Sequence, residues 1–320
     1  MNARERRTYW RAWHRFMTAQ QERWHPRILA ALKKQVAQFT AYARQHGLSA
    51  AQLQVASIVT IQPLMEVLPQ LYRHIGTARA RMIAQQERRY TEKEKTMGVN
   101  ERLTELILQH FQETVLNKSV YPITEYTRKQ ILRVVSQGLQ QGLGEDEILS
   151  MVTTSEYTES HARLVVRTEG VRAANAGAEL YAQESPLLYD KQWISAKDNR
   201  VRRPPKSKYD HWDLDGQVVP GDRAFFSGGE ELRYPGDPSG SAGNVCNCRC
   251  TTAYVPRRDA NGRLMRKPVL QTIAAGLPNS TILGTTGMPN SAQLPRNGII
   301  RAIGSSLLGE AFGELLSELF

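Results

Sequence analysis

The sequence predicts an α+β protein with a mostly helical N-terminal half, a small loop-rich α+β module with short antiparallel strands, and an extended C-terminal arm. Apolar residues recur at helical spacing through the first half, whereas Gly and Pro interrupt residues 191–250 every few positions. After Pro256 the composition shifts to Gly, Thr, Asn and Ser with few charges, which is typical of an arm or linker. We therefore expect a basic helical region over 1–120, the module over 121–256, and an arm over 257–320 that ends in a short helix.

The composition limits the class of protein and its partners. The chain has 320 residues, and its 41% hydrophobic content argues against wholesale disorder. A net charge of +11 favours a polyanionic partner, nucleic acid ahead of an acidic membrane surface, although basic surface also serves solubility alone. The three cysteines are clustered and form no disulfide framework, which fits a reducing cytoplasm. No apolar stretch approaches the ~18 residues of a membrane span, and no apolar signal region begins the chain.

Residues 1–46 predict one long basic helix, or two joined at Pro26, because apolar and aromatic residues follow a helical stripe. The residues that we expect to contact a partner are Arg4, Arg6, Arg7, Arg11, Trp13, Arg15, Lys33 and Lys34. Such a surface could bind phosphate, with aromatic stacking, or dock on another protein, since Trp and Arg are also favoured at protein interfaces. The pattern leaves both readings open.

Four further segments carry helical periodicity: residues 61–89, 101–116, 124–141 and 145–152. In the helical stretch around residue 167, the small residues Ala174, Ala178 and Ala182 would let a neighbouring helix or sheet approach closely. Arg167 and Glu169 are two positions apart and face different directions on a helix, so we expect each to reach into the module that follows.

The module from Trp193 onwards changes to strand-and-turn character. Its strand candidates are residues 192–194, 217–219 and 251–255. Asp215 and Gly216 predict a tight turn of the kind that closes a type I′ hairpin.

Hydrogen bonds between charged side chains are expected to hold this module together, because it has little core. We expect Arg200, Arg202 and Arg249 to donate to Asp198, Asp215, Glu169 or backbone carbonyls. Trp193 is expected in the core, and His211 as a hydrogen-bonding residue.

Two chemical alternatives remain open. Cys246, Cys248 and Cys250 alternate, so on a strand they would share one face, and His211 could complete a structural zinc site. Carboxylates such as Asp198, Asp213, Asp215 and Asp237 could instead bind Mg²⁺ and cut phosphodiesters, although turns rich in Asp also serve loop hydrogen bonding. The first alternative predicts a metal-stabilised module, the second a metal-dependent nuclease or hydrolase.

Taken in order, one set of motifs resembles the phage Mu F-like minor head protein family, also called phage head morphogenesis proteins. The resemblance covers roughly residues 125–255. The residues that carry it are Arg167, Glu169, Trp193, Asp198, Arg200, Arg202, His211, Asp215, Gly216, Asn247, Cys248, Arg249 and Cys250, together with Tyr234-Pro235-Gly236-Asp237-Pro238.

This resemblance implies a structural protein of a tailed-phage head without enzymatic activity or cofactor. It implies a place inside the head, with assembly in the host cytoplasm, and association with the portal protein and with major capsid or scaffold protein. It also implies a role in head assembly and in genome packaging or ejection. The basic surface would then lie against packaged double-stranded DNA without reading sequence. A DNA-binding protein that needs no portal is the alternative.

Overall fold

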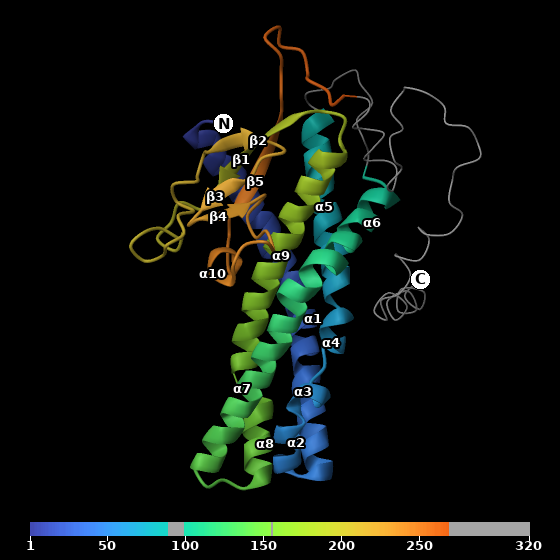
Figure 1. Cartoon of the computed structure of the whole chain (residues 1–320), viewed down its shortest axis with the longest axis vertical. Helices are drawn as coiled ribbons and strands as arrows, with labels where there is room; N and C mark the ends of the chain where they lie inside the picture. Colours follow the sequence, from blue (N-terminus) through green and yellow to red (C-terminus); the bar gives the residue numbers. More distant parts are fainter. Residues whose placement is uncertain (89–98, 155, 269–320) are drawn as a thin grey trace, which may run out of the picture. The chain divides into compact units, whose positions relative to one another are not determined.

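A computed structural model describes residues 1–88, 99–154 and 156–268 (Figure 1). Its helices are α1 (Ala3–His46), α2 (Leu48–Leu53), α3 (Val55–Ile58), α4 (Gln62–Met65), α5 (Leu68–Arg88), α6 (Glu101–His110), the π-helix η1 (Phe111–Val120), α7 (Tyr121–Gln140), α8 (Glu145–Thr154), α9 (Tyr157–Glu184) and α10 (Ala242–Val245). Its strands are β1 (Tyr189–Ile194), β2 (Val218–Pro220), β3 (Phe225–Ser227), β4 (Glu230–Leu232) and β5 (Thr251–Pro256). The predicted fold class is confirmed for these residues, whereas most of the predicted arm and its terminal helix lie outside them.

Helix α1 is a single helix of 44 residues, with Pro26 inside it. A capping box starts it: the Asn2 side chain accepts from the backbone N–H of Glu5, whose carboxylate in turn accepts from the Asn2 backbone. Gly47 ends the helix with φ at +85°, a conformation that favours glycine. Of the two predicted forms, the continuous helix is the one observed.

Helix α9 forms the centre of the helical part, packed along α5 and α1. Close approach depends on small residues: a Cβ added at Gly177 would lie 2.3 Å from the carbonyl oxygen of Gly76 in α5. Ala174 and Ala178 are fully buried, which confirms that the small residues of this stretch admit a neighbouring element.

An apolar core lies where the C-terminal half of α1 meets α2, α7 and α8 (Figure 1). It contains Val36, Phe39, Ala43, Leu48, Ala51, Val59, Ile131, Val135, Ile148, Leu149 and Val152. The apolar residues that repeat at helical spacing on each of these helices therefore pack into one shared core, as their spacing predicts.

The strands form a three-stranded antiparallel sheet in the order β2-β1-β5 and a separate β3-β4 hairpin. In the register of the sheet, Trp193 of β1 faces Thr252 of β5, and Lys191 faces Val219 of β2. All three predicted strands are confirmed. The β3-β4 hairpin was not predicted.

The N-terminal half of α1 packs against this sheet (Figure 1). Tyr9 donates its hydroxyl proton to the carbonyl of Thr252, and Trp13 Nε1 donates to the carbonyl of Arg249 at 3.0 Å. Arg79 of α5 also donates to the Thr252 carbonyl, at 3.2 Å. The described residues all belong to one compact unit, Met1–Gly276, and the predicted boundary after residue 120 falls where η1 passes directly into α7. The assignment of separate roles to residues 1–120 and 121–256 stays a prediction.

None of the helices in the described part of the chain is long and apolar enough to cross a lipid bilayer.

Candidate functional site

Asp198 and Arg249 form a bidentate ion pair that ties the loop after β1 to the segment before β5. Arg249 Nη1 and Nη2 donate to the two carboxylate oxygens of Asp198, each at 2.6 Å. The hydrogen bonds from Arg249 lower the pKa of Asp198 to about 2. The backbone N–H of Arg200 donates to the same carboxylate at 3.0 Å, while its guanidinium is mostly exposed, 3.8 Å away. Asp198 is thus the partner of Arg249 among those that the sequence analysis left open.

Two more arginines hold the segment just before β5 in place. Arg202 donates to the carbonyls of Gly243, at 2.7 Å, and Cys246. Arg167 of α9 donates to Asn247 Oδ1 at 2.7 Å, so this residue does reach into the module. Asn247 has φ at +58°, in the left-handed region that Asn tolerates better than most residues.

Asp215 and Gly216 close the turn before β2. Asp215 accepts from the backbone N–H of Ser195 at 2.8 Å and from Arg6 Nε at 3.2 Å. Gly216 has φ at +93° and donates its N–H to the Trp193 carbonyl at 2.8 Å. The predicted turn is present, but the predicted type I′ hairpin is wrong, because β2 pairs with β1 across a long intervening loop.

His211, Cys248 and Cys250 form a cluster in the core of the module, each no more than 3% exposed. His211 Nδ1 lies 3.6 Å from Cys248 Sγ and 3.8 Å from Cys250 Sγ. His211 Nε2 lies 2.7 Å from Asn244 Oδ1. Trp193 is fully buried beside them, as predicted, with its ring edge-on to His211.

The two buried thiols have opposite pKa shifts. A hydrogen bond with Cys250, aided by the His211 imidazole, holds the pKa of Cys248 well below its usual range. The same hydrogen bond, with burial, holds the pKa of Cys250 well above it. The backbone N–H of Cys250 also donates to Cys248 Sγ, at 3.4 Å.

Cys246 does not belong to this cluster, which corrects the predicted four-residue ligand set. The expected alternation fails because the cysteines precede β5, which begins at Thr251, and because Asn247 turns the chain with its positive φ. Cys246 is half-buried, and burial raises its pKa. Among the described residues, the candidate ligand group is His211, Cys248 and Cys250.

A polar row on α9, formed by Glu169, Arg172, Asn175 and Glu179, was largely missed by sequence analysis. All four side chains are buried. Arg172 Nε donates to the Gly236 carbonyl at 2.9 Å, and Asn175 Nδ2 donates to the Pro235 carbonyl at 2.9 Å. The row thereby binds the backbone of the Tyr234–Pro238 motif.

Glu169 corrects another expectation, because it does not reach into the module. It accepts from the hydroxyl of Tyr72 at 2.8 Å and from Arg172 at 3.1 Å. Its contact with the module is indirect, through Arg172.

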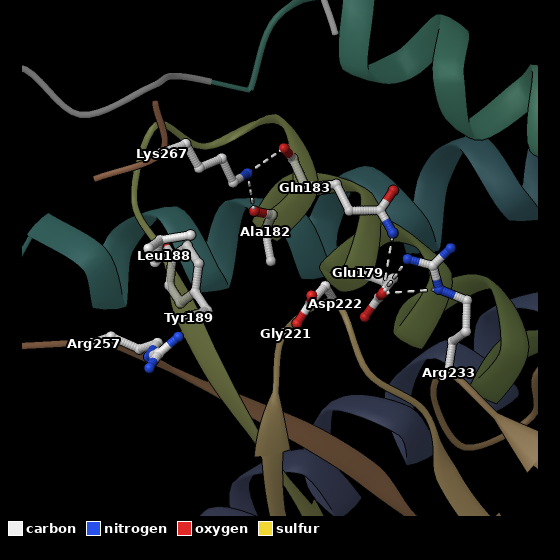
Figure 2. Close-up of a pocket in the computed structure, with 10 residues that line it drawn as sticks. All are labelled: Glu179, Ala182, Gln183, Leu188, Tyr189, Gly221, Asp222, Arg233, Arg257 and Lys267. Carbon is white, nitrogen blue, oxygen red and sulfur yellow. Dashed lines mark hydrogen bonds and ion pairs between the residues drawn. The ribbon is translucent and has the colours of Figure 1, made fainter. Parts of the chain in front are cut away.

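Glu179 lies at the wall of a cavity of about 360 Å³ (Figure 2). The cavity is lined by Glu179, Ala182, Gln183, Leu188, Tyr189, Gly221, Asp222, Arg233, Arg257 and Lys267. Arg233 and Gln183 converge on Glu179, with donor–acceptor distances of 3.1 and 3.0 Å.

Two lysines complete the hydrogen bonding around this cavity. Lys191 Nζ lies 3.3 Å from Glu179, and burial lowers its pKa. Lys267 donates to the carbonyls of Ala182 and Gln183 near the end of α9, where a cation stabilises unpaired carbonyls. The hydrogen bonds of Lys191 and Arg233 to Glu179 tie β1 and the segment after β4 to α9.

The predicted partner-binding residues of α1 divide into two groups. Arg4, Arg7, Arg11, Arg15, Lys33 and Lys34 are exposed. Trp13, expected on the partner surface, is instead buried at 2% exposure, because its indole packs beneath the chain before β5. Arg6 is half-buried in its ion pair with Asp215, and Lys34 pairs with Glu66 at 2.9 Å.

The four aspartates of the nuclease alternative do not converge. Asp198 pairs with Arg249, Asp215 with Arg6, and Asp237 accepts from the backbone N–H of Arg233. None of them, nor Asp213, belongs to the one potential metal-binding group in the described part of the chain.

Comparison with known protein families identifies the domain that these motifs mark. The family described as "Phage Mu protein F like protein" matches residues 129–253. The chain therefore contains a Phage Mu F-like domain, which confirms the resemblance seen in its motifs.

A particular relative is the minor head protein GP7 of Bacillus phage SPP1, which is 33% identical over 129 residues. The match spans 39% of this chain and 40% of the relative. No solved structure matches the chain significantly.

Proposed function

We propose that this chain is a minor head protein of a tailed phage, with a structural rather than enzymatic role inside the head. Its Mu F-like domain and its relative, named a minor head protein, support this role. The observation that carries it is the direction of the motif side chains. Asp198, Arg249 and Arg202 bond to each other or to backbone, and so hold loops in place rather than face a substrate.

The proposed protein partners are the portal protein and the major capsid or scaffold protein of the same phage. Exposed Lys33, together with Arg44 near the end of α1, offers them a basic helical surface. Co-expression with the portal protein, followed by affinity purification through the portal, tests this. A stable complex is expected. The proposal is contradicted if the two proteins form no complex and normal heads assemble that do not contain this protein.

We also propose sequence-independent contact with packaged DNA, because two basic surfaces lie at the sheet end of the molecule. The first comprises Arg4, Arg7, Arg11 and Arg15 of α1. The second is the loop after β1, where Lys197, Arg200, Arg203, Lys206 and Lys208 are exposed. The contacts of Tyr9 and Trp13 with the β5 region place the first surface beside the module.

Salt dependence of DNA affinity tests this contact. Each phosphate contact contributes about 0.9 to the slope of log affinity against log salt, so replacing Arg4, Arg7, Arg11 and Arg15 by Gln should flatten the slope by up to about four such steps. The matched control replaces Lys33 and Lys34, which lie about 27 Å or more along the helix from Arg15. Equal flattening per charge in both variants would show diffuse attraction instead of this surface.

A further inference from the structure

The cluster of His211, Cys248 and Cys250 joins two segments that are distant in the sequence, and we propose that it binds one zinc ion. His211 lies in the loop between β1 and β2, whereas both cysteines directly precede β5. Thiolate and imidazole together are the ligand set that selects zinc over Mg²⁺ or Ca²⁺. This inference is independent of the role in the phage head.

The spacing of the three ligand atoms fits a tetrahedral zinc site. Zinc bonds of about 2.3 Å to sulfur and about 2.0 Å to nitrogen, at tetrahedral angles, separate neighbouring N and S ligands by about 3.6 Å. His211 Nδ1 lies 3.6 Å from Cys248 Sγ and 3.8 Å from Cys250 Sγ. All three ligand atoms lie within 4.8 Å of one another, so a single ion can contact each of them.

Asn244 orients the histidine for this role. Asn244 Nδ2 donates to the Ser227 carbonyl at 3.3 Å and to Glu230 Oε2 at 3.0 Å. Its Oδ1 therefore faces His211 Nε2 as an acceptor, at 2.7 Å, and Nε2 must carry the proton. The lone pair of Nδ1 is left directed at the two sulfurs. Metal-bound histidines usually donate their second ring N–H to an oxygen in this way.

The surroundings also suit a buried zinc–thiolate centre. Zn²⁺ with two thiolates and a neutral imidazole has no net charge, so it can lie in an apolar cluster with Leu214, Phe225 and Val245. The Trp193 indole N–H is buried in the same cluster, next to Cys250. It can donate to a metal-bound thiolate of Cys250.

The site supplies three protein ligands. Within the described part of the chain, no fourth His, Cys, Asp or Glu joins the group. A water molecule would complete the coordination. Because the ion would join the loop after β1 to the start of β5, its binding free energy would add to the stability of a module with a small core.

Metal content of the full chain tests the site, with Cys246 as a matched control. The wild-type protein and C246S, purified under reducing conditions, should each contain about one zinc per chain by mass spectrometry. C248S, C250S and H211Q should contain little. Zinc loss from C246S equal to that from C248S would overturn the assignment.

A second measurement remains decisive if the ligand variants fail to fold. Wild-type protein stripped of metal by a chelator is titrated with Co²⁺, which gives the visible bands of tetrahedral cobalt and sulfur-to-cobalt charge-transfer absorption when thiolates bind. Saturation at one equivalent, reversal by Zn²⁺ and a raised melting temperature would support the site. Absence of these bands, with an unchanged melting temperature, would overturn it.

Discussion

Asp198 illustrates how a single ion pair makes the module sensitive to acid. The two hydrogen bonds from Arg249 stabilise its charged form and lower its pKa to about 2, from an ordinary value of 3.8. A lowered carboxylate pKa stabilises the fold fully above about pH 4, and this contribution declines as the pH falls towards 2. The side chain is 35% exposed, so solvent screening limits the contribution to about 1 kcal/mol.

Asp198→Asn should therefore lower the free energy of unfolding by about 1 kcal/mol at pH 6. The difference from wild type should shrink by about half at pH 3, because the wild-type carboxylate is then largely protonated in the unfolded chain. Urea unfolding of both proteins across this range measures it. A difference that stays constant down to pH 3 would show that the ion pair does not cause the loss.

Replacing Arg172 should lower the free energy of unfolding more than replacing Asp198 does, because the ion pair of Arg172 with Glu169 is buried. Each side chain is 3% exposed, and Arg172 also donates to Gly236 and Ser119. Within the described part of the chain, Arg172→Met leaves Tyr72 as the remaining side-chain donor to the buried charge of Glu169, so we expect a loss of about 3–5 kcal/mol in unfolding free energy.

The control for this prediction lies on the same helix. Arg163 pairs with Glu159 at 2.8 Å, but both side chains are exposed. Arg163→Met should cost at most about 0.5 kcal/mol in chemical denaturation. Equal losses in the two variants would mean that burial does not set the strength of these pairs.

The residue scale also shows how far the sequence predicts the site. That Arg249 bonds to a carboxylate or a carbonyl of the module was predictable, because charged residues in Gly- and Pro-rich loops must find partners among themselves, but the sequence did not single out Asp198. Asn175 and Glu179 were not singled out, although they repeat at helical spacing with Arg172. Spacing places residues on one face of a helix, but it does not say whether that face is covered.

At the scale of elements, the crossing of α5 and α9 depends on backbone contact. A Cβ on Gly177 would lie 2.3 Å from the oxygen and 2.6 Å from the carbonyl carbon of Gly76. Neither backbone atom can move away alone, so the helices must separate. Gly177→Ala should therefore destabilise the fold by about 3 kcal/mol, although Ala is the better helix former by about 1 kcal/mol.

Gly170→Ala, on the same helix, is the matched control. Its added Cβ would meet the end of the flexible Met17 side chain at 3.1 Å, which can shift aside. We expect this variant to melt at or above the wild-type temperature. If Gly177→Ala also melts there, the close crossing of α5 and α9 is not a constraint on stability.

Elements with a long repeating pattern were predictable, whereas of the three-residue strands β2 was predicted, from its two valines, and β3 and β4 were not. The long helices and the strands around Trp193 and Thr251 carry enough residues for a period to emerge. Strands β3 and β4 have three residues each and show no period. The cysteine alternation failed for a related reason, since a single residue with positive φ, Asn247, moves Cys246 out of register.

At the scale of the whole molecule, α1 belongs to the Mu F-like module as much as to the helical region. The apolar stripe of α1 predicts a buried face, but the sequence does not say what buries it. In the structure, Tyr9 and Trp13 cover the start of β5, and Arg6 pairs with Asp215. The family match begins at residue 129, so these contacts come from outside the domain that the family defines.

This arrangement predicts that residues 121–256 do not fold alone. Their removal from the N-terminal region would uncover Thr252 and leave the buried Glu169 without Tyr72. Leaving a buried charge with fewer donors costs several kcal/mol, about as much as a small module can contribute.

The full chain should melt cooperatively and resist proteolysis across the module. The 121–256 fragment should show neither behaviour in circular dichroism or limited proteolysis, and adding a 1–120 fragment in trans should restore protection. A cooperative melt of the isolated fragment would instead make the module an independent domain and α1 a separate docking helix.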